Sequence, residues 1–194
     1  MRVSRAQFAQ NREKIIDAAS ELFLDKGFSA IGVAEVMKAA GFTHGGFYGH
    51  FDSKEQLAYE TSRHLFHKTE QNWKQIINDH PEAPLEALFD FYLSSANLSG
   101  LSGPCALSSL SQELGRQSAE IRSALAGDIQ ALSTIIAELI PAADEVTRGR
   151  RALAAVTAMI GSISLARATD DPALAEAILS ATKANLLNSI NAVT

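Results

Sequence analysis

The chain has 194 residues, of which 46% are hydrophobic, 17 are Lys or Arg and 22 are Asp or Glu, giving a formal net charge of −5 at pH 7. This length allows one or two small domains with a real core, and the composition is that of an ordinary globular protein. The single cysteine excludes an internal disulfide and a metal site built from cysteines alone.

Helical periodicity dominates the first forty residues. An apolar stripe on residues 15–23 repeats every three to four positions, which predicts a first helix that Gly27 ends. A second, shorter stripe on residues 33–40 predicts a second helix that Gly41 ends. Because no stretch shows sustained period-two alternation, we expect an all-α fold.

The remaining helices are separated by Gly115 and by prolines, all of which lie beyond residue 80. The predicted helices cover residues 53–79, 85–98, 105–114, 118–140, 145–168 and 172–191. The uncharged and mostly apolar run at residues 152–166 has 15 residues, fewer than the roughly 20 that cross a bilayer. The N-terminus also lacks the apolar segment of a secretory signal. We therefore expect a cytoplasmic protein that makes no membrane contact.

Charge and glycine content divide the chain into two parts. Residues 1–54 hold seven Lys or Arg and six Asp or Glu, whereas residues 55–194 hold ten and sixteen. Half of the 12 glycines lie before residue 50. This shift predicts an N-terminal unit of short helices, residues 1–52, followed by a larger helical bundle, residues 53–194.

The stretch GFTHGGFYGHFDSKEQL, residues 41–57, carries the strongest functional signal. Thr43 is a good N-cap for a short helix, in which Phe47 and Phe51 lie at i, i+4 and would both face the core. Gly45 and Gly46 each cost roughly 1 kcal/mol of helix propensity but let the backbone approach a ligand closely. The stretch therefore predicts the second helix of a helix-turn-helix, which enters the major groove of DNA.

With these motifs, the chain resembles the TetR family of one-component transcriptional regulators. The resemblance covers residues about 8–57, including REKIIDAASELFLDKGF and VAEVMKAAGFTHGGFYGHFDSKEQL, and beyond residue 60 it is architectural only. It implies that four residues approach base edges and three contact phosphates. The base-edge residues are Thr43, His44, Gly45 and Gly46, and the phosphate contacts are Tyr48, His50 and Lys54.

The same resemblance implies an effector pocket and a dimer interface in the C-terminal part. The candidate pocket residues are mostly large and apolar, which suits a hydrophobic effector but equally suits an ordinary core. They are Phe66, Trp73, Phe89, Tyr92, Cys105, Leu110, Ile136 and Met159. The last two helices carry small or apolar side chains along one face, which favours a C2 four-helix bundle between two copies. That face holds Ala154, Ala158, Gly161, Leu165, Leu174, Ile178 and Ala181.

Cys105 and the histidines leave alternatives open. Cys105 begins a predicted helix, where a thiol pKa is lowered, so it suits either a redox or electrophile sensor or a small buried core residue. An enzyme would use Cys105 as nucleophile and His64 or His67 as base, but no third orienting group or nucleophile motif accompanies them. His44 and His50 lack neighbouring ligands at metal-binding spacing, so we expect no metal site.

The sequence therefore predicts a ligand-responsive transcriptional regulator, most simply a repressor. It would bind a pseudopalindromic double-stranded DNA operator as a homodimer and be released by a small-molecule effector. It would be neither an enzyme nor a cofactor-dependent protein. A general DNA-packaging protein is a weaker hypothesis, because the acidic C-terminal part opposes non-specific phosphate binding.

Overall fold

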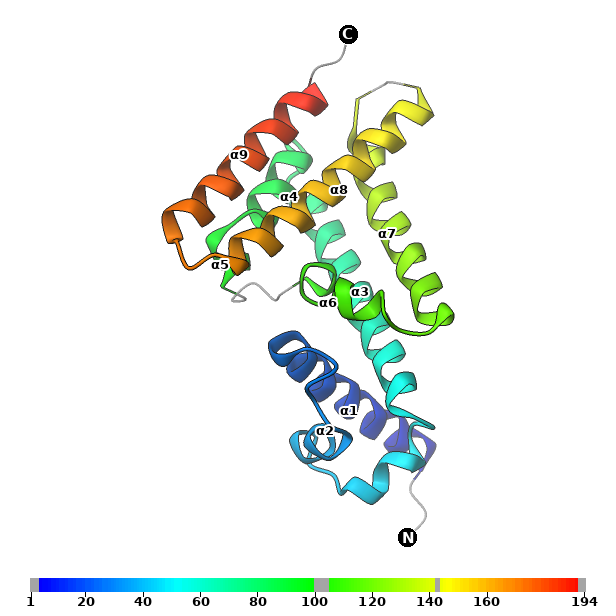
Figure 1. Ribbon diagram of the computed structural model, residues 1–194. Coiled ribbons are helices and arrows are strands. Elements are labelled where there is room, and N and C mark those ends of the chain that lie inside the picture. Colours follow the sequence, from blue (N-terminus) through cyan, green and yellow to red (C-terminus); the bar gives the residue numbers. More distant parts are fainter. Residues whose placement is uncertain (1–3, 100–104, 142–143, 192–194) are drawn as a thin grey trace.

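The computed structural model describes residues 4–99, 105–141 and 144–191, and within these ranges all regular structure is helical (Figure 1). The helices are α1 (Arg5–Lys26), α2 (Val33–Ala39), the short η1 (His44–Gly49), α3 (Lys54–Asp79), α4 (Pro84–Tyr92), α5 (Ser95–Leu98), α6 (Ala106–Leu114), α7 (Ala119–Leu139), α8 (Glu145–Ala168) and α9 (Pro172–Asn191). The prediction of an all-α fold with an N-terminal helix-turn-helix unit and a C-terminal helical bundle is confirmed.

The first two helices of the N-terminal unit end where the sequence indicated. The Ser4 hydroxyl caps α1 by accepting a hydrogen bond from the Gln7 amide at 3.1 Å. Gly27 ends α1 with φ at 81°, and Gly41 follows α2 with φ at 80°. Both values lie in the region that side chains other than glycine rarely adopt. These two glycines therefore turn the chain so that α1, α2 and η1 enclose one small core.

Helix α3 connects the two parts of the molecule. It has 26 residues, begins at Ser53, whose hydroxyl accepts from the Gln56 amide at 3.1 Å, and packs first against α1 and then against α4, α6 and α7. Figure 1 shows it running from the N-terminal unit up into the bundle. The division at residues 52 and 53 remains a prediction, because the helix that begins there contacts both units.

One predicted helix, residues 85–98, is two helices in the structure. Helix α4 ends at Tyr92 and α5 begins at Ser95. The intervening Ser94 donates a hydrogen bond to the Phe91 carbonyl at 2.8 Å and accepts one from the Asn97 amide at 3.1 Å. A serine side chain that bonds to the backbone on both sides competes with the helical ladder, and this local competition ends α4.

The bundle is completed by α7, α8 and α9, with α8 packed between the other two. By length and composition α8 could cross a bilayer, and 39% of its most apolar window is buried inside the protein. A core helix of a bundle passes the same test, so the feature is weak evidence for membrane insertion. Its buried side, which includes Val156, Met159 and Ile163, faces the core.

Candidate functional site

The short helix η1 presents the glycine-rich stretch at the end of the N-terminal unit. It is a 3₁₀-helix rather than an α-helix, because Gly45, Gly46 and Gly49 give it low α-helical propensity. Phe47 is fully buried, and its ring stacks on that of Phe51 with centroids 5.5 Å apart. The predicted inward placement of both phenylalanines is thus observed, and they anchor η1 to the core.

The opposite side of η1 is open to solvent. Thr43, His44, Gly45 and Gly46 are all exposed, and 66% of the Tyr48 side chain is accessible. A methyl group added at Gly45 would meet nothing within 4 Å. Thr43 occupies the N-cap position, although its hydroxyl makes no capping bond. The residues predicted to approach base edges therefore form one continuous exposed edge.

His50 differs from the other predicted phosphate contacts because it is half-buried. Its ring stacks on Phe8 of α1 with centroids 4.4 Å apart. Burial lowers the pKa of His50, and the nearby Arg12 guanidinium lowers it further. The imidazole is therefore neutral near pH 7, which suits a structural contact or a neutral hydrogen bond better than charge neutralisation of a phosphate.

Lys54 is the first residue of α3. Its ammonium nitrogen is 4.5 Å from the centroid of the Phe28 ring. This cation–π contact with Phe28 holds the Lys54 ammonium group next to the N-terminus of α3. The backbone amides of that N-terminus also attract anions. On the other side of the unit, Arg12 pairs with both Glu60 oxygens at 2.6 Å. This bidentate ion pair holds α1 against α3.

A carboxylate of α6 joins the bundle to the turn after α1. Glu113 of α6 accepts a hydrogen bond from the backbone amide of Ser29 at 2.8 Å. The same carboxylate lies directly against Gly27, where a side chain would overlap it. The turn after α1 is therefore in direct contact with α6 through Glu113.

The predicted effector-pocket residues are all buried in the bundle core. Their side chains are at most 5% exposed, and the Trp73 and Tyr92 rings pack edge to face at 5.7 Å. None of the eight lines either of the two larger pockets that the described residues form. The eight residues come together as predicted, but as packed core, and their role in ligand binding remains a prediction.

Cys105 is the N-cap residue of α6 and is 5% exposed. It lies beside the Tyr92 hydroxyl, whose pKa is raised mainly by burial and further by the neighbouring thiol. The Tyr92 hydroxyl has no hydrogen-bond partner within 3.5 Å among the described residues. Cys105 is thus a small side chain buried in the core beside Tyr92, as is common for structural cysteines, and this placement does not favour the redox alternative.

The enzyme hypothesis also lacks support, because both candidate bases have other partners. His64 lies 3.2 Å from the Asp17 carboxylate on α1, and His67 contacts Gln71 on its own helix at 2.9 Å. The first contact places His64 between α1 and α3, and the second places His67 on the surface of α3. Among the described residues, no group of His, Cys, Asp and Glu is arranged to hold a metal ion.

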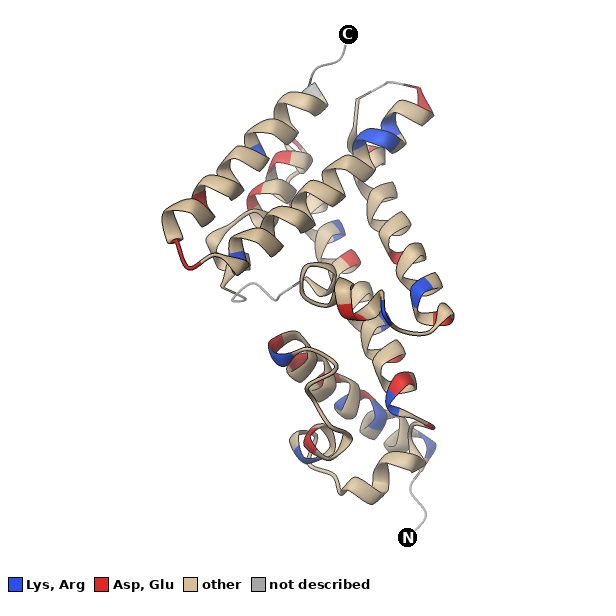
Figure 2. Ribbon diagram, viewed as in Figure 1, with Lys and Arg blue, Asp and Glu red and all other residues tan. Residues whose placement is uncertain are grey.

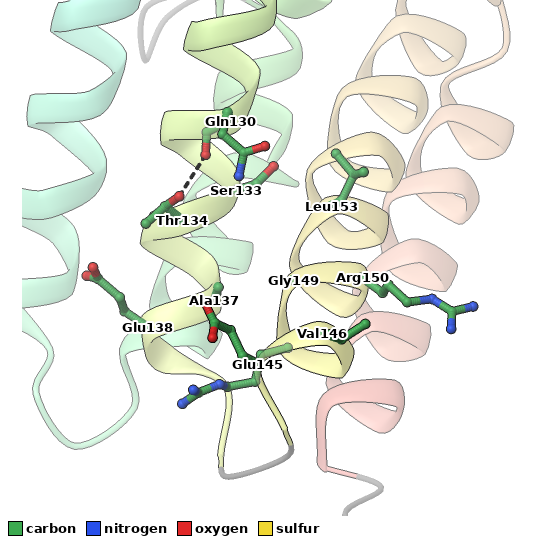
Figure 3. Close-up of a pocket in the computed structure, with 11 residues that line it drawn as sticks. Gln130, Ser133, Thr134, Ala137, Glu138, Glu145, Val146, Gly149, Arg150 and Leu153 are labelled. Carbon is green, nitrogen blue, oxygen red and sulfur yellow. Dashed lines mark hydrogen bonds between the residues drawn. The ribbon is translucent and has the colours of Figure 1, made fainter.

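Two of the pockets on the described surface lie away from these residues. One, of about 540 Å³, lies between α7 and α8, with Gln130 and Thr134 on one side and Leu153 on the other (Figure 3). The other, of about 800 Å³, lies between the end of α1 and helices α5, α6 and α8. We call the second the interdomain pocket. Neither pocket could be predicted from the sequence, because no sequence motif marks its lining residues.

Arg167 forms part of the interdomain pocket's wall. Its guanidinium donates to the carbonyls of Leu98 and Asn97 at 3.2 and 2.9 Å, and to the hydroxyls of Ser108 and Ser109 at 3.0 Å each. These bonds tie α5 and α6 to α8. One sequence signal could have pointed to Arg167, since this charged residue immediately follows the 15-residue uncharged run at residues 152–166.

The predicted dimer residues lie on an uncovered side of α8 and α9. Leu165 is 64% exposed and Leu174 is 49% exposed. Ala154 and Ala181 are also exposed, while Ala158, Gly161 and Ile178 are half-buried. Large exposed apolar side chains beside small ones are typical of a contact surface. We call these seven residues the α8–α9 face.

Comparison with known proteins confirms the resemblance and the fold. Residues 15–61 match the family model described as "Bacterial regulatory proteins, tetR family". The chain is 32% identical over 90 residues to the HTH-type transcriptional repressor KstR2 of Mycolicibacterium smegmatis, a match covering 46% of this chain and 43% of the relative. It is 26% identical over 115 residues to the repressor DhaR of a Mycobacterium species, covering 59% of this chain and 57% of the relative.

The chain thus spans about half the length of the curated relatives that it matches. A solved structure of a TetR-family transcriptional regulator from Cytophaga hutchinsonii superimposes on the whole chain with a TM-score of 0.80 at 18% identity, and both chains are covered fully. At that identity the likeness shows the fold alone. Together with the match over residues 15–61, it places the helix-turn-helix on a bundle shared with such regulators.

Proposed function

We propose that this chain, a TetR-family protein by its N-terminal module and its fold, is a ligand-responsive transcriptional repressor that binds a pseudopalindromic operator as a homodimer in the cytoplasm. The observation that supports it best is the exposed edge of Thr43, His44, Gly45 and Gly46, held out by the buried Phe47. Such an edge fits the major groove. Two copies would read half-sites about one helical turn, or a multiple of it, apart.

The proposed response to effector uses the contact between α6 and the turn after α1. An effector that shifts α6 would move Glu113 and, through the Ser29 amide, the helix-turn-helix. The spacing of the two reading edges would change, and operator affinity would fall. Couplings of this kind are typically about 1–3 kcal/mol. Selection of bound DNA from a random pool, followed by a screen for compounds that release it, tests the function directly.

The salt dependence of DNA affinity can distinguish a charged phosphate contact, Lys54, from a neutral one, His50. Lys54→Ala should weaken binding to all DNA sequences about equally. It should also lower by about 1 the magnitude of the slope of the logarithm of the binding constant against the logarithm of the salt concentration, because one cation no longer displaces a counterion. His50→Gln serves as the matched control and should leave the slope unchanged, since His50 is neutral near pH 7. Fluorescence anisotropy with operator and unrelated DNA at several salt concentrations measures both. A Lys54→Ala loss confined to the operator would contradict the assignment.

The homodimer is tested on the α8–α9 face. Leu165→Glu should raise the dimer dissociation constant by about 100-fold, because it places an unpaired carboxylate in an apolar contact. Leu153→Glu is the control, since Leu153 lies on the flank of α8 that lines the α7–α8 pocket. Sedimentation velocity over a range of concentrations measures the equilibrium. Dissociation of the Leu153→Glu dimer alone would move the interface to α7 and α8.

A further inference from the structure

The interdomain pocket is lined by Glu21, Asp25 and Lys26 on its α1 side and by Glu113 and Arg167 on its bundle side. Lys26 pairs with Glu35 and Glu113 accepts from the Ser29 amide, so the charges that remain without an ionic partner among the described residues are unlike on the two sides. On one side stands the Arg167 guanidinium, which none of the described residues matches with a carboxylate within 4 Å. On the other side, Glu21 and Asp25 near the end of α1 also have no cation within that distance among the described residues. Figure 2 shows acidic and basic segments side by side at this end of α1, below the bundle.

The Arg167 side is preorganised to receive an anion. Four of the five guanidinium N–H groups bond to neutral acceptors, so the side chain is fixed while its charge remains uncompensated. The Ser109 hydroxyl accepts from Arg167, and among the described residues no acceptor is found for its own proton. A carboxylate placed there would take the remaining guanidinium N–H and the Ser109 proton as two charge-assisted hydrogen bonds.

The acidic side makes a simple anion a poor occupant. Glu21 and Asp25 would repel a second negative charge in the same pocket, whereas they would attract an ammonium group. A pocket of about 800 Å³ is of the size that holds a small organic molecule. Its wall is also rich in hydroxyls, from Ser108, Ser111 and Ser164, which suits a polar ligand rather than an apolar one.

We propose that the interdomain pocket binds a small zwitterion, an amino acid or short peptide, with its carboxylate on Arg167 and Ser109 and its ammonium group toward Glu21 and Asp25. This inference rests on the proposed function only in taking the zwitterion as the effector. Such a ligand would join α1 to α6 and α8 beside Glu113, where occupancy alters the contact between the bundle and the helix-turn-helix.

The binding test uses the full chain and a panel of the twenty amino acids and alanine-containing dipeptides. Each compound is paired with its N-acetyl and its carboxamide derivative, which lack the ammonium and the carboxylate respectively. At about a hundred times its Kd, a true ligand should raise the Tm by about 5–10 °C, and both blocked forms should fail to do so. Absence of any shift across the panel, or equal shifts with the blocked forms, would overturn the proposal.

Four variants, one of them a control, then locate the site by titration calorimetry with the best compound of the panel. Ser109→Ala and Glu21→Gln should each weaken binding by about tenfold, as expected for loss of one charge-assisted contact. Glu82→Gln, an exposed acid in the turn before α4, should have no effect. Arg167→Lys keeps the charge and should bind more weakly than the wild type while remaining folded by circular dichroism. Unchanged affinity in Ser109→Ala and Glu21→Gln would place the ligand elsewhere.

The two proposals fail separately. If the protein selects a defined operator but no zwitterion stabilises it, the proposed function stands and the inference about the pocket is wrong. If the protein binds a zwitterion through Ser109 and Glu21 but has no sequence-specific DNA affinity, the inference about the pocket stands and the proposed function is wrong. If both hold, the bound compound should release the operator from the wild type, and Ser109→Ala should need about tenfold more of it.

Discussion

Replacing Phe47 with alanine is expected to lower the free energy of unfolding by about 3–5 kcal/mol and to abolish operator binding. The ring is fully buried and stacks on Phe51, so its removal leaves a cavity at the point where η1 is anchored. Small domains are stable by about 5–15 kcal/mol in total, and the variant would retain only part of that. Urea unfolding followed by circular dichroism measures the change.

Tyr48 provides the matched control, since it is the next residue along the same short helix but is 66% exposed. Tyr48→Ala should change the free energy of unfolding by no more than about 0.5 kcal/mol while weakening DNA binding through loss of a phosphate contact. The two neighbouring aromatics should thus separate stability from binding. Equal destabilisation by both substitutions would mean that η1 does not pack as described.

Gly27→Ala should lower the free energy of unfolding by about 2–4 kcal/mol, from two sources. The glycine has φ at 81° and ψ at 157°, a conformation that costs an alanine about 1–3 kcal/mol. The added methyl group would also displace the Glu113 carboxylate and break its hydrogen bond to the Ser29 amide, worth about 1 kcal/mol. Guanidinium chloride unfolding gives the total.

A double-mutant cycle separates the two sources. In a Glu113→Ala background the carboxylate is absent, so Gly27→Ala should cost about 1 kcal/mol less than in the wild type. Gly41→Ala is a comparison for the backbone alone, because Gly41 also has positive φ but nothing lies within 4 Å of an added methyl group. If Gly27→Ala costs the same in both backgrounds, Glu113 does not press on Gly27.

Local signals in the sequence were sufficient for most helix ends. Gly27 and Gly41 end helices because their positive φ values are open mainly to glycine, and Ser53 caps α3 through a bond to a residue three positions on. These effects act within one turn of chain and can be read without tertiary information. The inward placement of Phe47 and Phe51 likewise follows from i, i+4 spacing alone.

Features that depend on distant residues could not be predicted in this way. The interdomain pocket brings Glu21 of α1 together with Ser109 of α6 and Arg167 of α8, and no spacing in the sequence links them. The Glu113 contact with Ser29 joins residues 84 positions apart. The neutral state of His50 arises from burial against Phe8, so the resemblance alone could not reveal that its charge is suppressed.

The length of α3 has a mechanical consequence. With 26 residues and a rise of about 1.5 Å per residue, the helix is about 39 Å long, and it belongs to both parts of the molecule. A tilt of about 5° at its upper end would sweep the lower end through about 3 Å, close to the roughly 3.4 Å that separates successive base pairs. In the proposed function, the helix would therefore act as a lever that converts a small adjustment in the bundle into a displacement of about one base pair at the DNA.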